Sequence, residues 1–104
     1  MLRREAQGWA APENLASLNT PGDEGWPFLS EDGAELWFTR TCQGSPAIYR
    51  TIWDGAAWSA PELVISQFAG EPSLDRAGNL YFVHHHYRDG QPLGADIYVA
   101  VRRR

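Results

Sequence analysis

The sequence predicts an all-β fold built from two similar antiparallel sheets, and three observations lead to this prediction. First, the chain of 104 residues repeats itself: Trp-Ala-Ala-Pro-Glu at residues 9–13 recurs as Trp-Ser-Ala-Pro-Glu at 58–62, and Ile48-Tyr49 recurs as Ile97-Tyr98, each 49 positions later. Second, the repeat contains short runs of aromatic and β-branched residues, which favour strands. Third, turn residues such as Asp32-Gly33 separate these runs. Repeats of about 40 to 50 residues with this content are typical of β-propeller blades. We therefore expect two four-stranded antiparallel blades of a partial β-propeller.

The middle of the repeat is also present twice. Pro-Phe-Leu-Ser-Glu-Asp-Gly at residues 27–33 corresponds to Pro-Ser-Leu-Asp-Arg-Ala-Gly at 72–78, and Leu-Trp-Phe at 36–38 corresponds to Leu-Tyr-Phe at 80–82. These pairs are 45 and 44 positions apart, so small loop insertions account for the change in spacing. We expect a single repeat domain over residues 1–104, with blade-like units at about 24–65 and 70–104.

The individual strands follow from the apolar runs and the turns between them. In the first unit, strands are predicted over residues 26–29, 35–39 and 47–53, and a fourth strand begins at Trp58. Glu31-Asp32-Gly33 predicts a tight hairpin turn, and Asp54-Gly55 ends the third strand. In the second unit, the corresponding strands are predicted over residues 71–74, 79–83 and 95–101.

A segment equivalent to the fourth strand of the second unit occurs near the N-terminus. Residues 8–16 contain the same Trp-x-Ala-Pro-Glu pattern as the fourth strand of the first unit, so we expect them to form a latching outer strand. Propellers contain about four to eight blades, and two blades do not close a ring. The chain is therefore expected to associate through its strand edges, either with other copies, three of which would give a six-bladed ring, or with the blades of a longer parent propeller. A monomeric pair of sheets is the remaining alternative.

Charge and composition exclude several classes of function. All nine basic residues are Arg, and five of them lie at the two ends, so that residues 5–101 carry 4 Arg against 13 acidic residues. This acidic body disfavours nucleic-acid binding. No apolar run is long enough to span a membrane, and no apolar signal-peptide core follows Met1-Leu2-Arg3-Arg4. These features predict a soluble chain that is cytoplasmic by default. Cys42 is the single cysteine, which excludes an intramolecular disulfide and a multi-thiolate zinc site.

The run from Trp9 to Phe38 resembles the WD-like propeller repeats of the TolB type. In that family a strand leads into Ser-Pro-Asp-Gly and an aromatic strand, and Asp-Ile-Tyr follows later. Here Ser30-Glu31-Asp32-Gly33 and Asp96-Ile97-Tyr98 stand at these places, with Glu31 instead of the usual Pro. In the second unit Arg76-Ala77 replaces Pro-Asp. The resemblance covers nearly the whole chain and implies a propeller fold, and members of the family are often exported to the cell envelope.

Candidate ligand-binding residues lie where the loops of the two blades are expected to converge. The loop that enters the innermost strand and the loop after the second strand share one face of a propeller. This rim would carry Glu24, Trp26, Arg40, Glu71, His84 and His86, with Cys42 and His85 beside them.

The run of three His residues is a candidate for metal binding. Because side chains alternate along a strand, His84 and His86 are expected on one side and His85 on the other. Together with Glu71, the first two provide ordinary ligands for a divalent metal such as zinc. Consecutive His residues are not a usual zinc spacing, so we assign no cofactor, and solvated or hydrogen-bonded His is the competing interpretation.

Two further sets of residues have a structural and a functional interpretation. Asp32 and Asp75 are possible calcium ligands, but their place in hairpin turns favours hydrogen bonding to backbone N–H groups. The tryptophans are either sugar-binding platforms or packing residues, and their repeated placement favours packing. They are Trp9, Trp26, Trp37, Trp53 and Trp58.

The sequence therefore favours a noncatalytic repeat module that binds a protein, peptide or carbohydrate, or that serves assembly. The alternative is a hydrolase or lyase, with or without a bound metal, that uses Glu71, His84 and His86 on the rim. We assign no catalytic residues, because the sequence contains no complete catalytic constellation.

Overall fold

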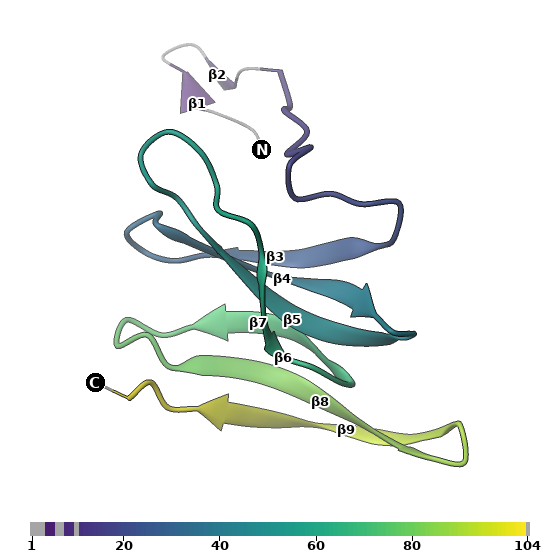
Figure 1. Cartoon of the computed structure of the whole chain (residues 1–104). Coiled ribbons are helices and arrows are strands. Elements are labelled where there is room, and N and C mark those ends of the chain that lie inside the picture. Colours follow the sequence, from purple (N-terminus) through teal and green to yellow (C-terminus); the bar gives the residue numbers. More distant parts are fainter. Residues whose placement is uncertain (1–3, 6–7, 10, 104) are drawn as a thin grey trace.

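The computed structural model describes residues 4–5, 8–9 and 11–103, which form strands and turns without a helix (Figure 1). A two-stranded sheet comprises β1 (Arg4–Glu5) and β2 (Gly8–Trp9). The first large sheet contains, in order, β3 (Glu24–Leu29), β4 (Glu35–Cys42), β5 (Ser45–Ile52) and β6 (Glu62–Ile65). The second sheet contains β7 (Ala69–Leu74), β8 (Leu80–Arg88) and β9 (Gln91–Ala100). The predicted all-β fold with two antiparallel sheets is thus confirmed, and these sheets have four and three strands.

The two sheets begin with hairpins of the same local structure. A β-bulge interrupts the first hairpin between Gly25 and Phe28 and the second between Gly70 and Ser73. A bulge adds an unpaired residue and bends the edge strand. The bulges lie at matched positions of the sequence, 45 residues apart.

The turns of these hairpins also match. The Gly33 N–H donates to the Ser30 carbonyl at 2.9 Å, and the Gly78 N–H donates to the Asp75 carbonyl at 3.0 Å. Both glycines have positive φ, 74° and 86°, which glycine adopts without a steric cost. Turn chemistry therefore closes both hairpins as the sequence predicts.

Strands β4 and β8 are longer than predicted. Each continues to a two-residue turn in which both residues have positive φ, Gln43-Gly44 and Asp89-Gly90. This geometry matches the twist of an antiparallel hairpin and lets the ladder run to its end. Consequently Arg40, Cys42 and the His run 84–86 lie within strands, not in the loops that follow them.

The predicted outer strand over residues 8–16 does not join the second sheet of this chain. Gly8 pairs with Glu5 and Trp9 with Arg4, and residues 11–15 belong to no strand. Figure 1 shows the reason: β1 and β2 lie beyond one side of the first sheet, and β9 lies at the opposite end of the molecule. The second sheet therefore has three strands instead of the expected four.

The core lies between the two large sheets. Strand β7 packs against β3, β4 and β5. The buried cluster joins the first sheet to the second through Trp37, Ile48, Ala69 and Leu80. Burying an aliphatic or aromatic side chain of this size contributes roughly 1.5 to 3 kcal/mol. The same contact places the starts of β3 and β7 side by side.

Candidate functional site

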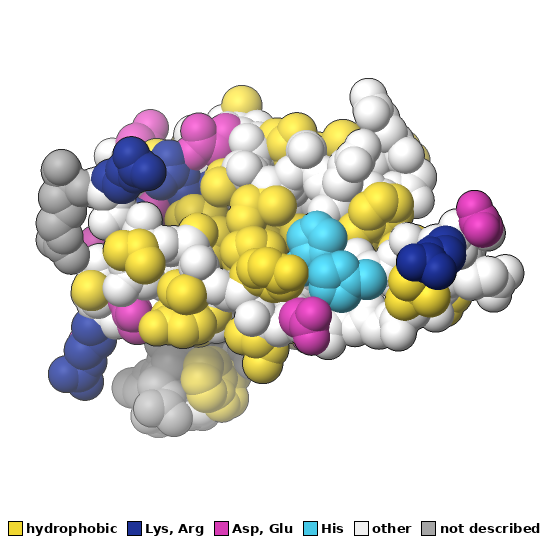
Figure 2. Space-filling model, turned by 90° about the horizontal axis from the view of Figure 1, so that it is seen from below, with side chains coloured by type: hydrophobic (Ala, Val, Ile, Leu, Met, Phe, Trp, Pro, Cys, Tyr) yellow, Lys and Arg dark blue, Asp and Glu magenta, His cyan; other side chains and the backbone are white. Residues whose placement is uncertain are grey.

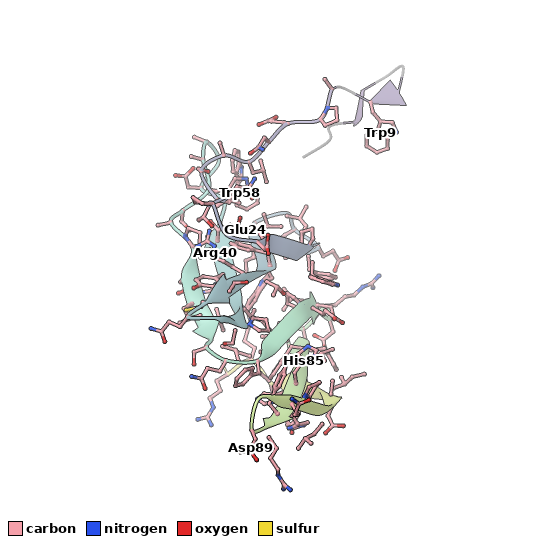
Figure 3. The ribbon with its side chains drawn as sticks, turned by 90° about the vertical axis from the view of Figure 1, so that its right-hand side faces the viewer. Trp9, Glu24, Arg40, Trp58, His85 and Asp89 are labelled. Atoms are coloured by element: carbon pink, nitrogen blue, oxygen red, sulfur yellow. The ribbon has the colours of Figure 1, made fainter. Side chains whose placement is uncertain are left out.

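Two of the predicted rim residues, Glu24 and Arg40, form an ion pair (Figure 3). They face each other across β3 and β4, with Nε of Arg40 3.0 Å from Oε2 of Glu24. The Thr20 N–H and hydroxyl also donate to this carboxylate, and Arg40 donates to the Leu18 carbonyl. Burial alone would raise the pKa of Glu24, but the hydrogen bonds from Thr20 and Arg40 lower it below its usual value. This pair ties the segment before β3 to the sheet.

Trp26 and Glu71 occupy matched positions in the bulges of β3 and β7. Both have positive φ, 48° and 56°, and each precedes a proline. The Trp26 side chain is 63% exposed, and Glu71 is exposed as well. Positive φ at a residue other than glycine is uncommon and costs on the order of 1 to 3 kcal/mol. The fold thus holds two large polar or aromatic side chains at strained, exposed positions on adjacent edge strands.

His84 and His86 lie on one face of β8, as strand alternation predicts. Their ring centroids are 5.1 Å apart, and both rings contact Tyr98, at 5.5 and 6.3 Å. Nε2 of His86 is 3.0 Å from Oδ2 of Asp96. In the described part of the chain, Nδ1 of His84 is buried without a hydrogen-bond partner.

His86 thus pairs with the carboxylate of Asp96, which is not among the predicted site residues. Asp96 faces His84 across β8 and β9, and its place in the second half of a long hairpin brings it to the His residues. Asp89-Gly90 indicates the two-residue turn that joins the strands, and a bulge between His86 and Tyr87 shifts the register by one residue, so that Asp96 faces His84. Among residues 4–5, 8–9 and 11–103, no group of three or more His, Cys, Asp and Glu side chains could hold a metal ion.

The remaining candidates have local roles. Cys42 is half-buried at the end of β4, and its hydrogen bond with Tyr49 raises the pKa of the Tyr49 hydroxyl. Asp32 accepts from the Ser30 hydroxyl at 2.6 Å and from the Ala34 N–H at 2.9 Å. The Asp75 carboxylate accepts from the N–H and side-chain amide of Asn79, each at 3.0 Å. The turn role predicted for both aspartates is confirmed.

A hollow of about 550 Å³ lies between these turns, at the opposite end of the strands from the predicted rim. Its walls include both hairpin turns and Arg102, whose Nη2 lies 3.3 Å from Oε1 of Glu35. Asp32 and Asp75 line it, but their carboxylates already accept hydrogen bonds within the turns. We therefore do not place the binding site here.

Only part of the tryptophan prediction is confirmed. Trp37 is 4% exposed and belongs to the core, whereas Trp9 is 57% exposed and Trp26 63%. Trp53 and Trp58 contact each other, with ring centroids 5.2 Å apart. Packing explains Trp37 and this pair, and it does not explain Trp26.

Comparison with family models, with curated proteins and with solved structures found no match to this chain. In the part that the structure describes, no helix has the length and hydrophobicity needed to cross a membrane.

Proposed function

We propose that this chain is a noncatalytic β-propeller repeat module, with repeats of the TolB type, that binds its ligand at the inner edges of its sheets. The observation that carries the proposal is the matched placement of Trp26 and Glu71. Each occupies the bulge of an edge strand, with positive φ and an exposed side chain. Backbone strain of this kind persists where the surrounding structure enforces it, and it concentrates at binding sites.

The two side chains offer complementary chemistry. The Trp26 indole presents a large flat surface on which an aromatic side chain or the apolar face of a sugar ring stacks. The Glu71 carboxylate accepts hydrogen bonds from hydroxyl or amide groups. A protein, peptide or carbohydrate that combines a ring with hydrogen-bond donors fits this pair. Binding by such a pair needs no metal or other cofactor.

The alternative of a hydrolase or lyase has less support. It requires Glu71, His84 and His86 to converge within hydrogen-bond reach of one substrate. The structure pairs His86 with Asp96 and joins the Glu71 N–H to the Thr39 hydroxyl. A binding module requires none of this convergence.

The test is a binding screen of the purified chain on a printed glycan array and on a displayed peptide library. For the best probe, Trp26→Ala and Glu71→Gln are each expected to weaken binding at least about tenfold, which corresponds to about 1.4 kcal/mol. Leu29→Ala and Glu31→Gln are the matched controls. Leu29 is exposed on the same strand as Trp26, and Glu31 is exposed in the turn that follows, and each substitution should change affinity less than about twofold. Equal effects of both pairs would contradict the proposal. Turnover of the probe, detected by mass spectrometry and lost in His86→Ala, would favour the enzyme alternative.

A further inference from the structure

We infer that β9 is a docking edge for a second copy of this chain, whose residues 9–16 add the fourth strand and whose β3 packs on the adjoining face. The inference rests on the blade interpretation in the proposed function, but not on any ligand.

Strand β9 is uncovered along its whole length. All ten of its residues are exposed, although most are apolar. Ile97 is 79% exposed, whereas its counterpart Ile48, at the matched position of β5, is fully buried. Figure 2, seen from the side where β9 lies, shows a broad hydrophobic area next to the His side chains. An exposed apolar edge strand of this kind is a template for pairing with another strand.

Residues 9–16 have the sequence of the missing strand. They are identical to residues 58–65 at four of eight positions, and the latter include β6, which covers β5. In the first sheet β6 pairs with β5 in the register Ile48↔Ile65, Tyr49↔Leu63 and Arg50↔Glu62. The same register, displaced by the 49 residues of the repeat, joins Ile97 to Ala16, Tyr98 to Asn14 and Val99 to Glu13 of the incoming copy.

The two partners also change together where the segment before β6 makes a buried polar contact with β5. Thr51 is fully buried, and its hydroxyl donates to the Ser59 carbonyl and lies 3.1 Å from the Ser59 hydroxyl. The counterpart of Thr51 is Ala100, and the counterpart of Ser59 is Ala10. Both hydroxyls are thus absent from the second pair, and neither strand would bury an unsatisfied polar group.

The strand cannot come from the same copy in this structure. Figure 1 shows β2 at one end of the molecule and β8 and β9 at the other, and Figure 3 shows Trp9 far from His85 and Asp89 of the second sheet. Residues 11–14 are exposed and belong to no strand. The strand that would cover β9 is therefore expected from another copy.

A pair of glycines indicates what packs on the face of β8 and β9. A Cβ on Gly70 would lie 3.2 Å from Oγ1 of Thr39, a tighter contact than most Cβ atoms make, so the packing of the two sheets favours glycine there. Gly25 is at the matched position of β3 and has ordinary φ, yet a Cβ added to it would meet nothing within 4 Å. The counterpart of Thr39 is Val83, which is half-buried on β8. Gly25 of a second copy against Val83 would repeat the contact between the sheets of one chain.

The first sheet also offers a receiving groove, which Pro27 and Leu29 of β3 help to line. An apolar hollow of about 440 Å³ is lined by residues that include Leu36, Trp53 and Trp58. Leu80, the counterpart of Leu36, is 4% exposed because it packs with Trp37 and Ile48. Tyr81 and Ile97 are the counterparts of Trp37 and Ile48. In the head-to-tail contact they belong to the copy that presents β8 and β9, and they would pack against Leu36 of the other copy.

The resulting contact is head to tail, because it joins two different surfaces of the same chain. Such contacts form closed rings when the rotation between copies is suitable. Three copies, with two sheets each, would form a six-bladed ring within the usual range for propellers.

The test is the mass of the full chain by light scattering after size exclusion. We expect a trimer, with a mass of three times 11.7 kDa. Ile97→Glu and Gly25→Val should each give a monomer with an unchanged circular dichroism spectrum, since both positions are open in the single chain. Leu93→Glu is the matched control, because Leu93 is 61% exposed on the same strand but lies outside the expected pairing, and it should remain trimeric.

A synthetic peptide of residues 8–19 gives a second measurement that does not depend on folding of a variant. In excess, it should occupy β9 and dissociate the wild-type assembly. A wild-type chain that stays monomeric at high micromolar concentration overturns the inference. A dimer that is lost in Ile97→Glu but retained in Gly25→Val overturns it in favour of symmetric β9 to β9 pairing. If Trp26→Ala loses ligand binding but remains a trimer, assembly does not depend on the ligand site. If a monomer still binds the ligand, the proposed function stands and this inference fails.

Discussion

At the residue scale, Trp26 and Glu71 show how the chain uses backbone strain. Their side chains leave the regular alternation of the strand because the bulge forces positive φ at each. Asparagine and glycine adopt this conformation at lower cost than glutamate or tryptophan. Trp26 and Glu71 are therefore less favourable for stability than asparagine or glycine would be at these two positions.

Glu71→Asn is accordingly expected to raise the free energy of unfolding by about 0.5 to 1 kcal/mol, and Glu71→Val to lower it by about 1 to 2 kcal/mol. Urea denaturation followed by circular dichroism measures both. Val99→Asn is the control: its φ is ordinary and it lies in a strand, so asparagine should destabilise there. If asparagine had the same effect at both positions, strain at residue 71 would not be the cause.

The turn aspartates make stability depend on pH. Hydrogen bonds from the Ser30 hydroxyl and the Ala34 N–H lower the pKa of Asp32, and those from Asn79 lower the pKa of Asp75. A carboxylate with a lowered pKa in the folded state stabilises the fold above its usual pKa, and this contribution is lost as the pH falls through the lowered value.

We expect the melting temperature to fall as the pH is lowered from about 5 to about 2, and to fall less steeply in Asp75→Asn, which removes one of these protonation steps. Thermal unfolding across this range tests the prediction. Asp23→Asn, which changes the same charge outside both hairpin turns, is the control. A steep fall that is identical in both variants would assign the acid sensitivity to other groups.

At the element scale, the neighbours that cover a strand decide how much its residues contribute to the free energy of unfolding. Ile48 and Ile97 are the same residue type at matched positions of β5 and β9, fully buried in one case and 79% exposed in the other. Strand β6 and the second sheet cover β5, whereas β9 is the last strand of its sheet.

Ile48→Ala should therefore cost about 2 to 5 kcal/mol of unfolding free energy, because it leaves a cavity in the core. Ile97→Ala should cost less than about 0.5 kcal/mol when the chain is diluted to its monomer. Chemical denaturation at low concentration compares them directly. Similar costs would mean that β9 is already covered within the single chain.

At the scale of the whole molecule, the two sheets approach each other closely at a position without a side chain, Gly70. Gly70 lies against Thr39, and the hydroxyl of Thr39 accepts a hydrogen bond of 3.0 Å from the Glu71 N–H. Arg102 adds a second connection through Glu35 of the first sheet. Both contacts join residues that are far apart in the sequence.

Gly70→Ala should lower the unfolding free energy by about 1 to 3 kcal/mol, because the added methyl group would crowd the Thr39 side chain, which packs between the sheets and accepts a hydrogen bond from the Glu71 N–H. Gly25→Ala should change it by no more than about 0.5 kcal/mol in the monomer, since nothing lies within 4 Å of the new atom. Unfolding monitored in parallel by tryptophan fluorescence and circular dichroism measures both. Equal destabilisation by the two substitutions would contradict this packing.

Most strands and turns could be predicted from the sequence, because apolar runs and turn residues act locally. The hairpin turns at Gly33 and Gly78 and the face shared by His84 and His86 follow from such patterns. The lengths of β4 and β8 were predicted too short, although Asp89-Gly90 carried the signal for a two-residue turn. Less of the candidate site was predictable, since the partner of an ionised side chain depends on register across two strands.

By itself, the sequence determined the two β-rich units, their turns and the spacing between matched residues, because side-chain periodicity and glycine conformation are properties of short segments. Only the tertiary structure decided that Glu24 pairs with Arg40, that His86 meets Asp96, and which strand remains uncovered. These outcomes depend on contacts between distant segments. No local pattern of residues fixes which segments pack together and which are left open.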